Sequence, residues 1–546
     1  MNVQNANTEV FDLCIIGAGP LGIITTLEYA KLNKNKKIIL IEFGKKKIES
    51  KNSLDESIEI SNSINHHTPY ESTNKGLGGS SATWGGRCVN YDEVDFIDRP
   101  IINNGCTWDI SFFEEVKPYL KNAAEYFECG NPDFNLDEVE EFKTFRISEN
   151  FKSGDITDST LERWSMPTRF GKRYSKELEE NESILLLEGY EVQKFSDPDK
   201  SGNISSLVAR NTYSNEVLNI NAIKFVLSAG TQETTRILLK NKNIFKNLPN
   251  VPNALGKYYQ GHISGKIASV KFYGDPKKTD YGFMRDSSGI YLRRRFQFTK
   301  EFLVENNLLN TAIWLDNPLY FDPIHKNGAM SFMYLAMITP FIGKKLAPPA
   351  IAHSITKGKV VGLSGHFFNL LKDFPKSIAV PVSIFYKRYL LNRKLPGVFL
   401  YSPQNKYALH FHAEQIPDES NKMTLSNNGE TLKIDYDIKD GDINSVIELH
   451  KRLDSYLREI NCGELEYWYQ PKDLFQAIKN MSKDGIHQSG TTRIGRNADE
   501  GVVDRNLLVF GTSNLYICSC SVLPTSSQAN PTFFGGALAV RLSNQL

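Results

Sequence analysis

The first strong pattern of hydrophobic positions lies in residues 11–44, FDLCIIGAGPLGIITTLEYAKLNKNKKIILIEFG. An apolar run from Phe11 to Ile16 is followed by apolar residues at helical spacing, and then by a second apolar run from Ile38 to Ile41. Short apolar runs indicate buried strands, and a repeat of three to four residues indicates a helix that buries one face. The pattern predicts a strand, a helix and a strand.

Other segments repeat these patterns. We predict a strand and a helix in IKFVLSAGTQETTRILL, residues 223–239, and strands of an antiparallel sheet in SGKIASVKFYG and NKMTLSNN. Helical periodicity runs through residues 443–460. Near the C-terminal end, LYICSCS is a predicted buried strand, and an apolar helix is predicted from Asn530 to Leu542.

The turn after the first strand has the composition of a dinucleotide site. It carries the GxGxxG motif of Gly17, Gly19, Pro20, Leu21 and Gly22. Glycines at this junction allow a tight turn, close approach to a pyrophosphate and close helix packing. Glu42 follows at the end of the second strand, where an acid can bind ribose hydroxyls. The motif does not separate FAD from NAD, and a glycine-rich turn of another α/β protein is the alternative.

A second glycine-rich segment follows, KGLGGSSATWGGRCVNYDEVDF, residues 75–96. So many glycines do not suit a regular helix or strand, but they suit a backbone that lies against a flat ligand. A flexible linker is the alternative. Trp84 and Arg87 argue against it, because a linker has little use for either side chain.

Composition narrows the class of protein. The chain has 546 residues, of which 40% are hydrophobic and 23% charged, as in a soluble globular protein of two or more domains. The formal net charge of +1 argues against a nucleic-acid partner. The polar start lacks the pattern of a secretion signal, and the seven cysteines include no CxxC pair. We therefore expect a reducing, cytoplasmic setting and no metal site.

The segment GLGGSSATWGGR resembles the second flavin-contacting motif of the glucose–methanol–choline (GMC) oxidoreductases, closest to the bacterial sugar-oxidising branch and the pyranose oxidases. The resemblance implies FAD as the cofactor. In pyranose oxidases a histidine before the tryptophan links covalently to FAD, whereas this chain has Thr83, which implies non-covalent binding. The residues of this motif expected at the flavin are Gly79, Ser80, Ser81, Thr83, Trp84 and Gly85.

The resemblance continues in the middle of the chain. Residues 164–192 resemble the family segment that leads to a strand touching adenine, which places Val192 at the cofactor. Ala229 and Gly230 match the family's AGxxxTPxLL-like segment, with Thr235 where proline is common. Residues 254–265 resemble a segment that carries a histidine, and for His262 we expect a structural role.

The C-terminal segment resembles the family most continuously. The family pattern HxxGTxxMG corresponds to HQSGTTRIG, which begins at His487, and the family's second site residue, His or Asn, corresponds to Asn530. Ser519 replaces an aspartate and is implied to meet the flavin's ribityl chain, and Pro531 and Thr532 are implied to lie at the cofactor. A histidine can take a proton near neutral pH, and an asparagine can orient the alcohol oxygen. The alternatives are a loop histidine and a helix-capping asparagine.

Residues Lys344 to Lys394 form an unusual basic and apolar stretch. It contains ten lysines and arginines and a single acid, Asp373. Basic and apolar residues together are typical of an element that lies on a membrane surface, although a helical insertion with a solvated basic face is the alternative. We expect peripheral contact at the inner membrane face and allow for a lipid-linked substrate.

The combined prediction is an α/β protein of the GMC fold. A Rossmann-type FAD domain is expected from residues 1–100, 190–265 and 485–546. Residues 101–189 are expected to connect it to an α+β substrate domain on an antiparallel sheet, residues 266–484, with the basic insertion at about 331–400. By the resemblance, the protein oxidises an alcohol on a sugar, sugar derivative or polyol. Lyase chemistry with an unreduced flavin, or a membrane-associated binding protein, are the alternatives. The electron acceptor is left open.

Overall fold

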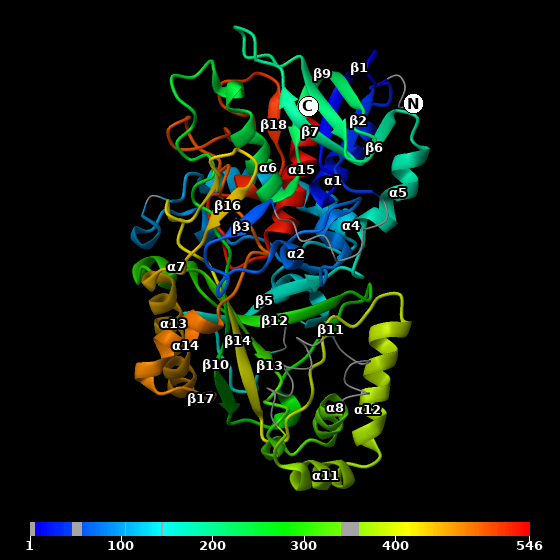
Figure 1. Cartoon of the computed structure of the whole chain (residues 1–546). Coiled ribbons are helices and arrows are strands. Elements are labelled where there is room, and N and C mark those ends of the chain that lie inside the picture. Colours follow the sequence, from blue (N-terminus) through cyan, green and yellow to red (C-terminus); the bar gives the residue numbers. More distant parts are fainter. Residues whose placement is uncertain (1–5, 46–56, 104, 143–145, 340–359) are drawn as a thin grey trace.

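The computed structural model describes residues 6–45, 57–103, 105–142, 146–339 and 360–546. Within these residues the strands form three sheets, two large and one small. The sheet that contains the first strand of the chain and the sheet that contains the strands of residues 263–413 occupy opposite ends of the molecule (Figure 1). Each end has its own hydrophobic core.

The first sheet is built around the predicted strand–helix–strand unit, which is confirmed. Its strand order is β6-β2-β1-β9-β8-β7, and β18 also pairs with β9. The pairs among β6, β2, β1, β9 and β18 are parallel, while β7 and β8 run antiparallel. The strands are β1 (Val10–Ile16), β2 (Ile38–Glu42), β6 (Ile184–Glu188), β7 (Tyr190–Phe195), β8 (Ser206–Asn211), β9 (Val217–Leu227) and β18 (Leu515–Ile517).

Strands β1 and β2 are almost entirely buried, because helices cover the sheet. Helix α1 packs against α15, the C-terminal helix, although more than 490 residues separate their first residues. The helices of this end are α1 (Pro20–Leu32), α2 (Pro69–Ser72), α3 (Ile110–Val116), α4 (Leu120–Phe127), α5 (Phe170–Glu180), α6 (Gly230–Lys240) and α15 (Pro531–Gln545).

The second large sheet is antiparallel, as the middle segment predicted. Its order is β17-β10-β14-β13-β12-β5-β4, with β11 beside β12. Its strands are β4 (Arg87–Cys88), β5 (Ile156–Trp164), β10 (Ile263–Phe272), β11 (Met284–Arg285), β12 (Tyr291–Phe298), β13 (Thr311–Asp316), β14 (Lys406–Ala413) and β17 (Gly463–Tyr467). Helices α7 (Lys300–Glu305), α13 (Asp440–Glu459) and α14 (Leu474–Met481) lie at this end, and α13 confirms the periodicity of residues 443–460.

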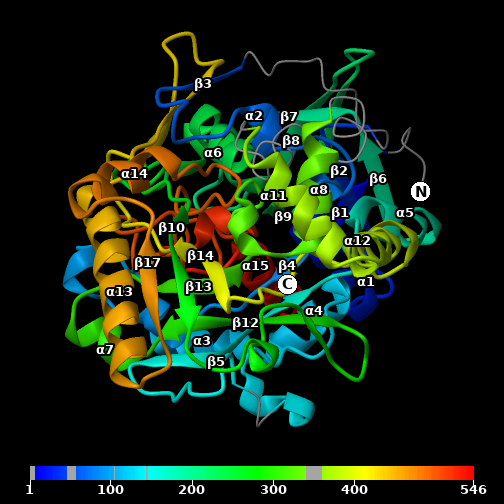
Figure 2. The same cartoon turned by 90° about the horizontal axis from the view of Figure 1, so that it is seen from below.

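Two smaller units complete the described structure. Strands β3 (Ile58–Ile60), β15 (Lys422–Leu425) and β16 (Leu432–Asp435) form the small sheet. Helices α11 (Leu363–Lys372) and α12 (Lys376–Phe385) both pack on α8 (Gly328–Ile338). The three helices project from the end of the molecule that holds the second large sheet, which we call the substrate end (Figures 1 and 2). Residues 340–359 of the predicted basic insertion lie outside the described residues. In the described part, no helix is long and apolar enough to cross a membrane.

The predicted fold class is confirmed: a Rossmann-type domain is joined to an α+β domain on an antiparallel sheet. The chain crosses between the two large sheets more often than the predicted domain boundaries imply. Strand β6 lies in the first sheet although it precedes residue 190, and β4 and β5 lie in the second sheet although they precede residue 266. A strand belongs to the sheet in which it finds hydrogen-bonding partners, and sequence order does not reveal those partners.

Candidate active site

A cavity of about 580 Å³ runs along the carboxyl ends of the first sheet's parallel strands. In open α/β sheets, ligands bind at this edge. All predicted cofactor residues except Gly22 line it, and so do His487 and Asn530. The predicted cofactor residues on its wall are Gly17, Gly19, Pro20, Leu21, Glu42, Gly79, Ser80, Ser81, Thr83, Trp84, Gly85, Val192, Ala229, Gly230, Ser519, Pro531 and Thr532.

The turn between β1 and α1 explains why Gly22 does not line the cavity. A Cβ atom on Gly22 would lie 1.9 Å from the carbonyl oxygen of Gly17, so Gly22 allows the helix to pack on the turn. Gly17 itself has φ of +101°. By contrast, a Cβ atom on Gly19 would meet nothing within 4 Å, because Gly19 faces the open cavity. Gly22 is therefore needed for packing of the helix on the turn, whereas Gly19 leaves space for a ligand to approach the backbone.

Glu42 is fixed at the cavity edge by backbone groups. Its Oε2 accepts a hydrogen bond from the Ala18 N–H at 2.8 Å, and its Oε1 accepts from the N–H groups of Gly44 at 3.0 Å and Gly76 at 2.8 Å. A carboxylate has about four acceptor positions, so one remains for a ligand hydroxyl. Through these hydrogen bonds Glu42 links the glycine-rich turn at Ala18 to the second glycine-rich segment at Gly76.

The second glycine-rich segment is an ordered wall of the cavity. Residues Gly79–Ala82 form a short 3₁₀ turn. The Trp84 indole N–H donates to the Thr168 carbonyl at 2.9 Å, and its ring contacts Phe127 and Phe170. These contacts exclude the linker alternative, because Trp84 is anchored in a packed core.

The cavity has the features that FAD requires. The N-terminal ends of α1, α6 and α15 all open into it, and helix N-termini offer free N–H groups and partial positive charge to a pyrophosphate. Several polar atoms of its lining residues are buried without a hydrogen-bond partner among the described residues, and they include Ser228 Oγ, Gln232 Oε1, Gln232 Nε2 and Asn530 Oδ1. Buried polar atoms need partners, and a polar cofactor supplies them. The residues therefore fit FAD.

At one end of the cavity, the loop before His487 meets the start of α15. His487 Nε2 lies 2.6 Å from Asn530 Nδ2, so the amide N–H donates to the ring nitrogen. Asn530 is the residue before α15, yet its side chain makes no capping hydrogen bond. The capping alternative for Asn530 therefore does not describe its side chain.

Asp484 fixes the other side of the His487 ring. Its Oδ2 lies 3.4 Å from His487 Nδ1, and its Oδ1 accepts the His487 backbone N–H at 3.1 Å. Burial alone would raise the pKa of Asp484, but the neighbouring His487 and His262 outweigh burial and hold the pKa well below its usual range. The ionised carboxylate favours a proton on Nδ1 and leaves Nε2 as an acceptor.

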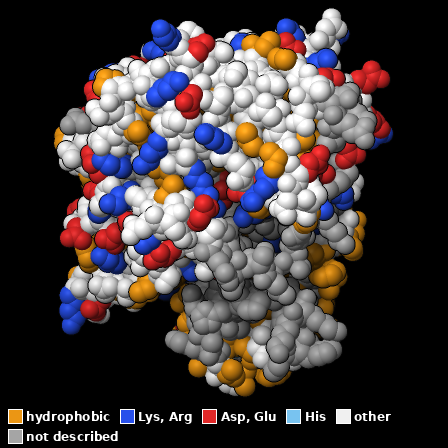
Figure 3. Space-filling view, turned by 45° about the horizontal axis from the view of Figure 1, so that its top comes forward, with side chains coloured by type: hydrophobic (Ala, Val, Ile, Leu, Met, Phe, Trp, Pro, Cys, Tyr) orange, Lys and Arg blue, Asp and Glu red, His pale blue; other side chains and the backbone are white. Residues whose placement is uncertain are grey.

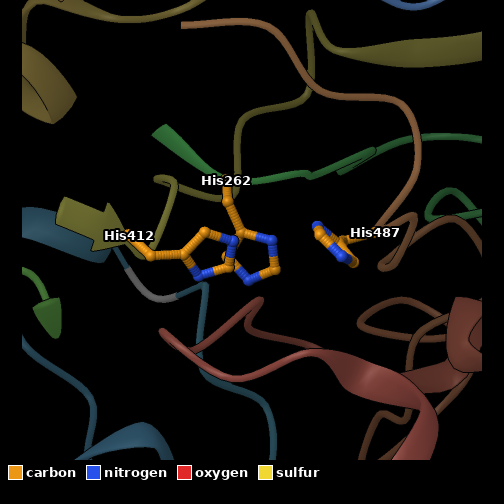
Figure 4. A group of neighbouring side chains, drawn as sticks. All are labelled: His262, His412 and His487. Atoms are coloured by element: carbon orange, nitrogen blue, oxygen red, sulfur yellow. The ribbon is translucent and has the colours of Figure 1, made fainter. Parts of the chain in front are cut away.

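His487 has two further histidines beside it. His262 and His412 stack with ring centroids 4.1 Å apart, and both meet the His487 ring edge to face, at 5.0 and 5.4 Å (Figure 4). Burial lowers the pKa of His262 and, more strongly, that of His412, so both rings are neutral near pH 7. His262 is buried beside His487, and its Nδ1 lies 3.2 Å from Asp484 Oδ2.

The three imidazoles are close enough to suggest a metal site, with nitrogens within 4.8 Å of one another. However, the stacked planes of His262 and His412 differ by only 28°. An imidazole lone pair lies in its ring plane, so two stacked rings do not point at one ion. His412 Nδ1 also hydrogen-bonds to the Gln528 carbonyl at 2.7 Å. The cluster is therefore a packed polar wall rather than a ligand set.

Charged side chains from other strands of the second sheet lie beside this cluster. Arg87 lines the cavity and pairs with the buried Glu162 at 2.5 Å, while its guanidinium lies 4.6 Å from the centre of the Trp314 ring. Burial lowers the pKa of Arg87 to about 10. Arg293 pairs with the same Glu162, so two arginines share one carboxylate. These side chains together carry excess positive charge.

Sequence reasoning did not single out Asp484, His412 or Gln232. One signal for Asp484 was available, because it precedes His487 by three residues and can reach the same ring. His412 lies on β14, 75 residues from His487, and only the pairing of β14 with β10 brings it beside His262. No local pattern marks such a residue.

Comparison with known proteins agrees with this geometry. Residues 417–539, which include His487 and Asn530, match the family model described as GMC oxidoreductase, in its C-terminal form. No curated protein matches the chain.

Solved structures resemble the whole chain. They include a variant of Aspergillus oryzae formate oxidase studied for FAD modification (16% identity, 98% of both chains, TM-score 0.52). Pyridoxine 4-oxidase, named as from Mesorbium loti, matches at 13% identity over 98% of this chain and 99% of that one, with a TM-score of 0.50. An FAD-dependent oxidoreductase from Chaetomium thermophilum matches at 14% identity over 98% of both chains, with a TM-score of 0.50.

These names do not include a sugar oxidase, so the predicted closeness to the sugar-oxidising branch stays a prediction. The fold is nevertheless that of the GMC oxidoreductases, and the segment that carries the candidate catalytic pair matches their family model. Residues 417–539 are thus similar to the C-terminal segment of the GMC oxidoreductases, and the fold of the whole chain is similar to that of the solved oxidases named above.

Proposed function

We propose that the protein oxidises an alcohol to a carbonyl compound with non-covalently bound FAD, and that His487 takes the hydroxyl proton. The observation that carries this proposal is the arrangement of His487. Its Nε2 is an acceptor at the end of the cofactor cavity, 2.6 Å from Asn530 Nδ2, and its Nδ1 faces the ionised Asp484. A base held by a carboxylate and facing a ligand cavity is suited to general base catalysis.

Each residue has one task in this reaction. The alcohol O–H replaces the Asn530 amide as the hydrogen-bond donor to His487 Nε2, and the amide N–H of Asn530 then donates to the alcohol oxygen. His487 takes the proton, and Asp484 stabilises the resulting imidazolium through Nδ1. When bound, FAD supplies the acceptor for the hydride that leaves the alcohol carbon.

The cofactor contacts follow from the cavity wall. We propose that the backbone near Gly19 and Pro20 binds the pyrophosphate, that Glu42 accepts from a ribose hydroxyl, and that Val192 lies beside adenine. Ser519, Pro531 and Thr532 lie toward the His487 end of the same cavity and are proposed to hold the flavin portion. Thr83 supports non-covalent attachment, because its hydroxyl is an ordinary hydrogen-bond acceptor for Asn74 at 2.7 Å.

The proposed substrate class is a sugar, sugar derivative or polyol. The resemblance of the Thr83–Arg87 segment to the carbohydrate branch supports this choice. The polar character of the wall supports it as well, because Arg87 and His487 both line the cavity and offer hydrogen bonds to hydroxyl groups.

The test is a spectroscopic one. The purified holoenzyme is mixed without oxygen with sugars, sugar derivatives and polyols, and the flavin absorbance is followed. We expect the band to bleach with at least one of them. A protein that takes up no flavin when FAD is added would overturn the cofactor assignment. A bound flavin that stays oxidised with every alcohol, long-chain alcohols included, would overturn the redox reaction.

A further inference from the structure

The helices that project from the substrate end expose an unusual amount of apolar surface. Of the 29 large hydrophobic side chains exposed in the described part of the chain, 14 lie between residues 360 and 390. On and next to α11, Phe368, Leu371 and Phe374 are 65 to 72% exposed. Figure 3 shows hydrophobic side chains gathered at this end of the molecule. Large exposed apolar patches on soluble proteins mark sites of interaction.

The same helices carry positive charge. Between residues 360 and 394 there are six lysines and arginines and one acid, Asp373. The Asp373 carboxylate turns inward and accepts the Gly328 backbone N–H at 2.7 Å. Lys372, Lys376 and Lys387 are exposed, and none of them pairs with an acid among the described residues. Apolar side chains beside unpaired lysines complement an anionic lipid surface.

Behind these helices lies a second cavity, of about 1440 Å³. Its wall is largely apolar, and α8 and α12 contribute to it, with Phe332, Ala336 and Phe385 among the lining residues. Its other side is the second sheet, where Lys266, Asp316 and His410 present polar atoms. Apolar space of this size exceeds the small voids of an ordinary packed interior. The shape and chemistry suit a molecule with one apolar and one polar end.

A thin wall separates the second cavity from the active site. The His410 ring, which lines the second cavity, stacks on Trp314 at 4.5 Å between centroids. Trp314 also contacts Arg87, which lines the cofactor cavity, at 4.6 Å, and His412 at 6.2 Å, and the His412 ring in turn meets His487. The second cavity and the cofactor cavity are therefore neighbours, with Trp314 and the side chains that contact it between them.

We propose that the second cavity holds the apolar chain of an amphiphilic alcohol substrate, and that α11 and α12 dock on the anionic lipid surface from which it enters. This inference rests on the proposed alcohol oxidation and names a further property of its substrate. A sugar or polyol joined to a long apolar chain has both a hydroxyl group for the proposed oxidation and an apolar part for the second cavity.

The cavity is tested with a dansyl-labelled undecanoic acid as the probe and 1-dodecanol as its competitor. We expect the holoenzyme to bind the probe and dodecanol to displace it. Ala336→Trp and Met337→Trp each place a ring in the cavity and should weaken probe binding by at least about tenfold. Ala379→Trp is the matched control, because Ala379 is exposed on α12 and does not line the cavity. Flavin absorbance and circular dichroism confirm that each variant folds.

The docking surface is tested by flotation with vesicles of phosphatidylcholine containing about 30% phosphatidylglycerol. We expect the holoenzyme to float with them and to be released by salt. Phe368→Ser combined with Leu371→Ser should reduce the bound fraction about tenfold. Val217→Ser, an exposed residue of the first sheet, should not change it. A wild-type protein that binds no vesicles would assign the patch to a protein partner and overturn the lipid surface.

Neither assay requires flavin turnover, so the two proposals fail separately. If the probe does not bind, or if both tryptophan variants bind it as the wild type does, the cavity assignment is wrong even when polyols bleach the flavin. If the probe binds as expected but no alcohol bleaches the flavin, the oxidation is wrong and the cavity remains a lipid-chain site.

Discussion

His487 is held at both ring nitrogens, by Asp484 on one side and Asn530 on the other. The family resemblance implies His487 and Asn530 as a pair, because each falls at a position of the family's C-terminal pattern, 43 residues apart. It does not show that their side chains meet, since the loop before His487 and the start of α15 join only in the folded protein. The alternative of an isolated loop histidine does not fit these contacts.

At the residue scale, the first prediction concerns His487→Ala. We expect the variant to keep its flavin absorbance, because none of the proposed cofactor contacts is made by the His487 side chain. Anaerobic reduction by the alcohol that bleaches the wild type should slow roughly 10²- to 10⁴-fold, the usual contribution of a general base. An unchanged rate of reduction would remove His487 from the mechanism.

The second prediction concerns Asp484→Asn, a change in a positioning residue. The variant loses the negative charge that stabilises the protonated His487 ring, so the acid limb of its pH–rate profile should move to lower pH, and the maximal rate should fall roughly 10- to 100-fold. A purely structural role would lower the amount of folded protein without moving the limb. Asp484→Glu keeps the charge and is expected to restore the position of the limb.

At the scale of elements, the turn between β1 and α1 separates packing from binding. Gly22→Ala places a Cβ atom against the Gly17 carbonyl and should lower the free energy of unfolding by roughly 1–3 kcal/mol, the usual cost of overpacking. Gly19→Ala meets open space in the protein and should leave the stability of the apoprotein unchanged while it weakens FAD binding. Chemical unfolding of both apoproteins and FAD titration measure the two effects. Equal effects of the two variants would contradict this division.

The strands and helices themselves were largely predictable. The β1–α1–β2 unit, β10 and α13 follow from local patterns, because short apolar runs mark the buried strands and apolar residues at helical spacing mark the helices. The pairing of these strands within the sheets was not predictable. Strand β5 joins the second sheet and β6 the first, although only 19 residues separate the end of β5 from the start of β6. Strand pairing depends on contacts between distant segments, and such contacts leave no local pattern.

At the scale of the whole molecule, the cofactor cavity joins distant segments of the chain. Residues near positions 20, 80, 230, 490 and 530 all line it. Removal of FAD should therefore lower the Tm, and adding FAD at about 100 times its Kd should restore on the order of 3 kcal/mol of stability. Thermal unfolding of the apoprotein with FAD, and with riboflavin as a control without pyrophosphate, measures this. Equal stabilisation by riboflavin would contradict a dinucleotide site.

Buried histidines should make the whole molecule sensitive to mild acid. His450 is fully buried and burial lowers its pKa to about 4, against about 6.5 in an unfolded chain. As the pH falls through this window, the unfolded chain binds a proton that the folded chain does not. Stability therefore falls, by roughly 3 kcal/mol for this residue, and is unaffected by it above about pH 7.

The variant His450→Leu tests this expectation. It removes one such proton and should flatten the dependence of the free energy of unfolding on pH between about pH 6.5 and about pH 4. Urea unfolding at several pH values gives the slope of the free energy of unfolding against pH for the wild type and for the variant. Identical slopes in the two proteins would show that His450 does not contribute.

The sequence by itself determined the first strand–helix–strand unit and its dinucleotide motif, because both rest on a short segment whose spacing fixes its local chemistry, whereas the class of fold and the candidate catalytic pair were implied by the resemblance to the GMC family. Only the tertiary structure decided which polar groups surround that pair. Asp484 against His487, the stacked His262 and His412, and the thin wall between the two cavities all depend on segments that lie close together in space but far apart in the chain. Such neighbours are set by packing and strand pairing across the whole molecule, and these have no counterpart in any single stretch of sequence.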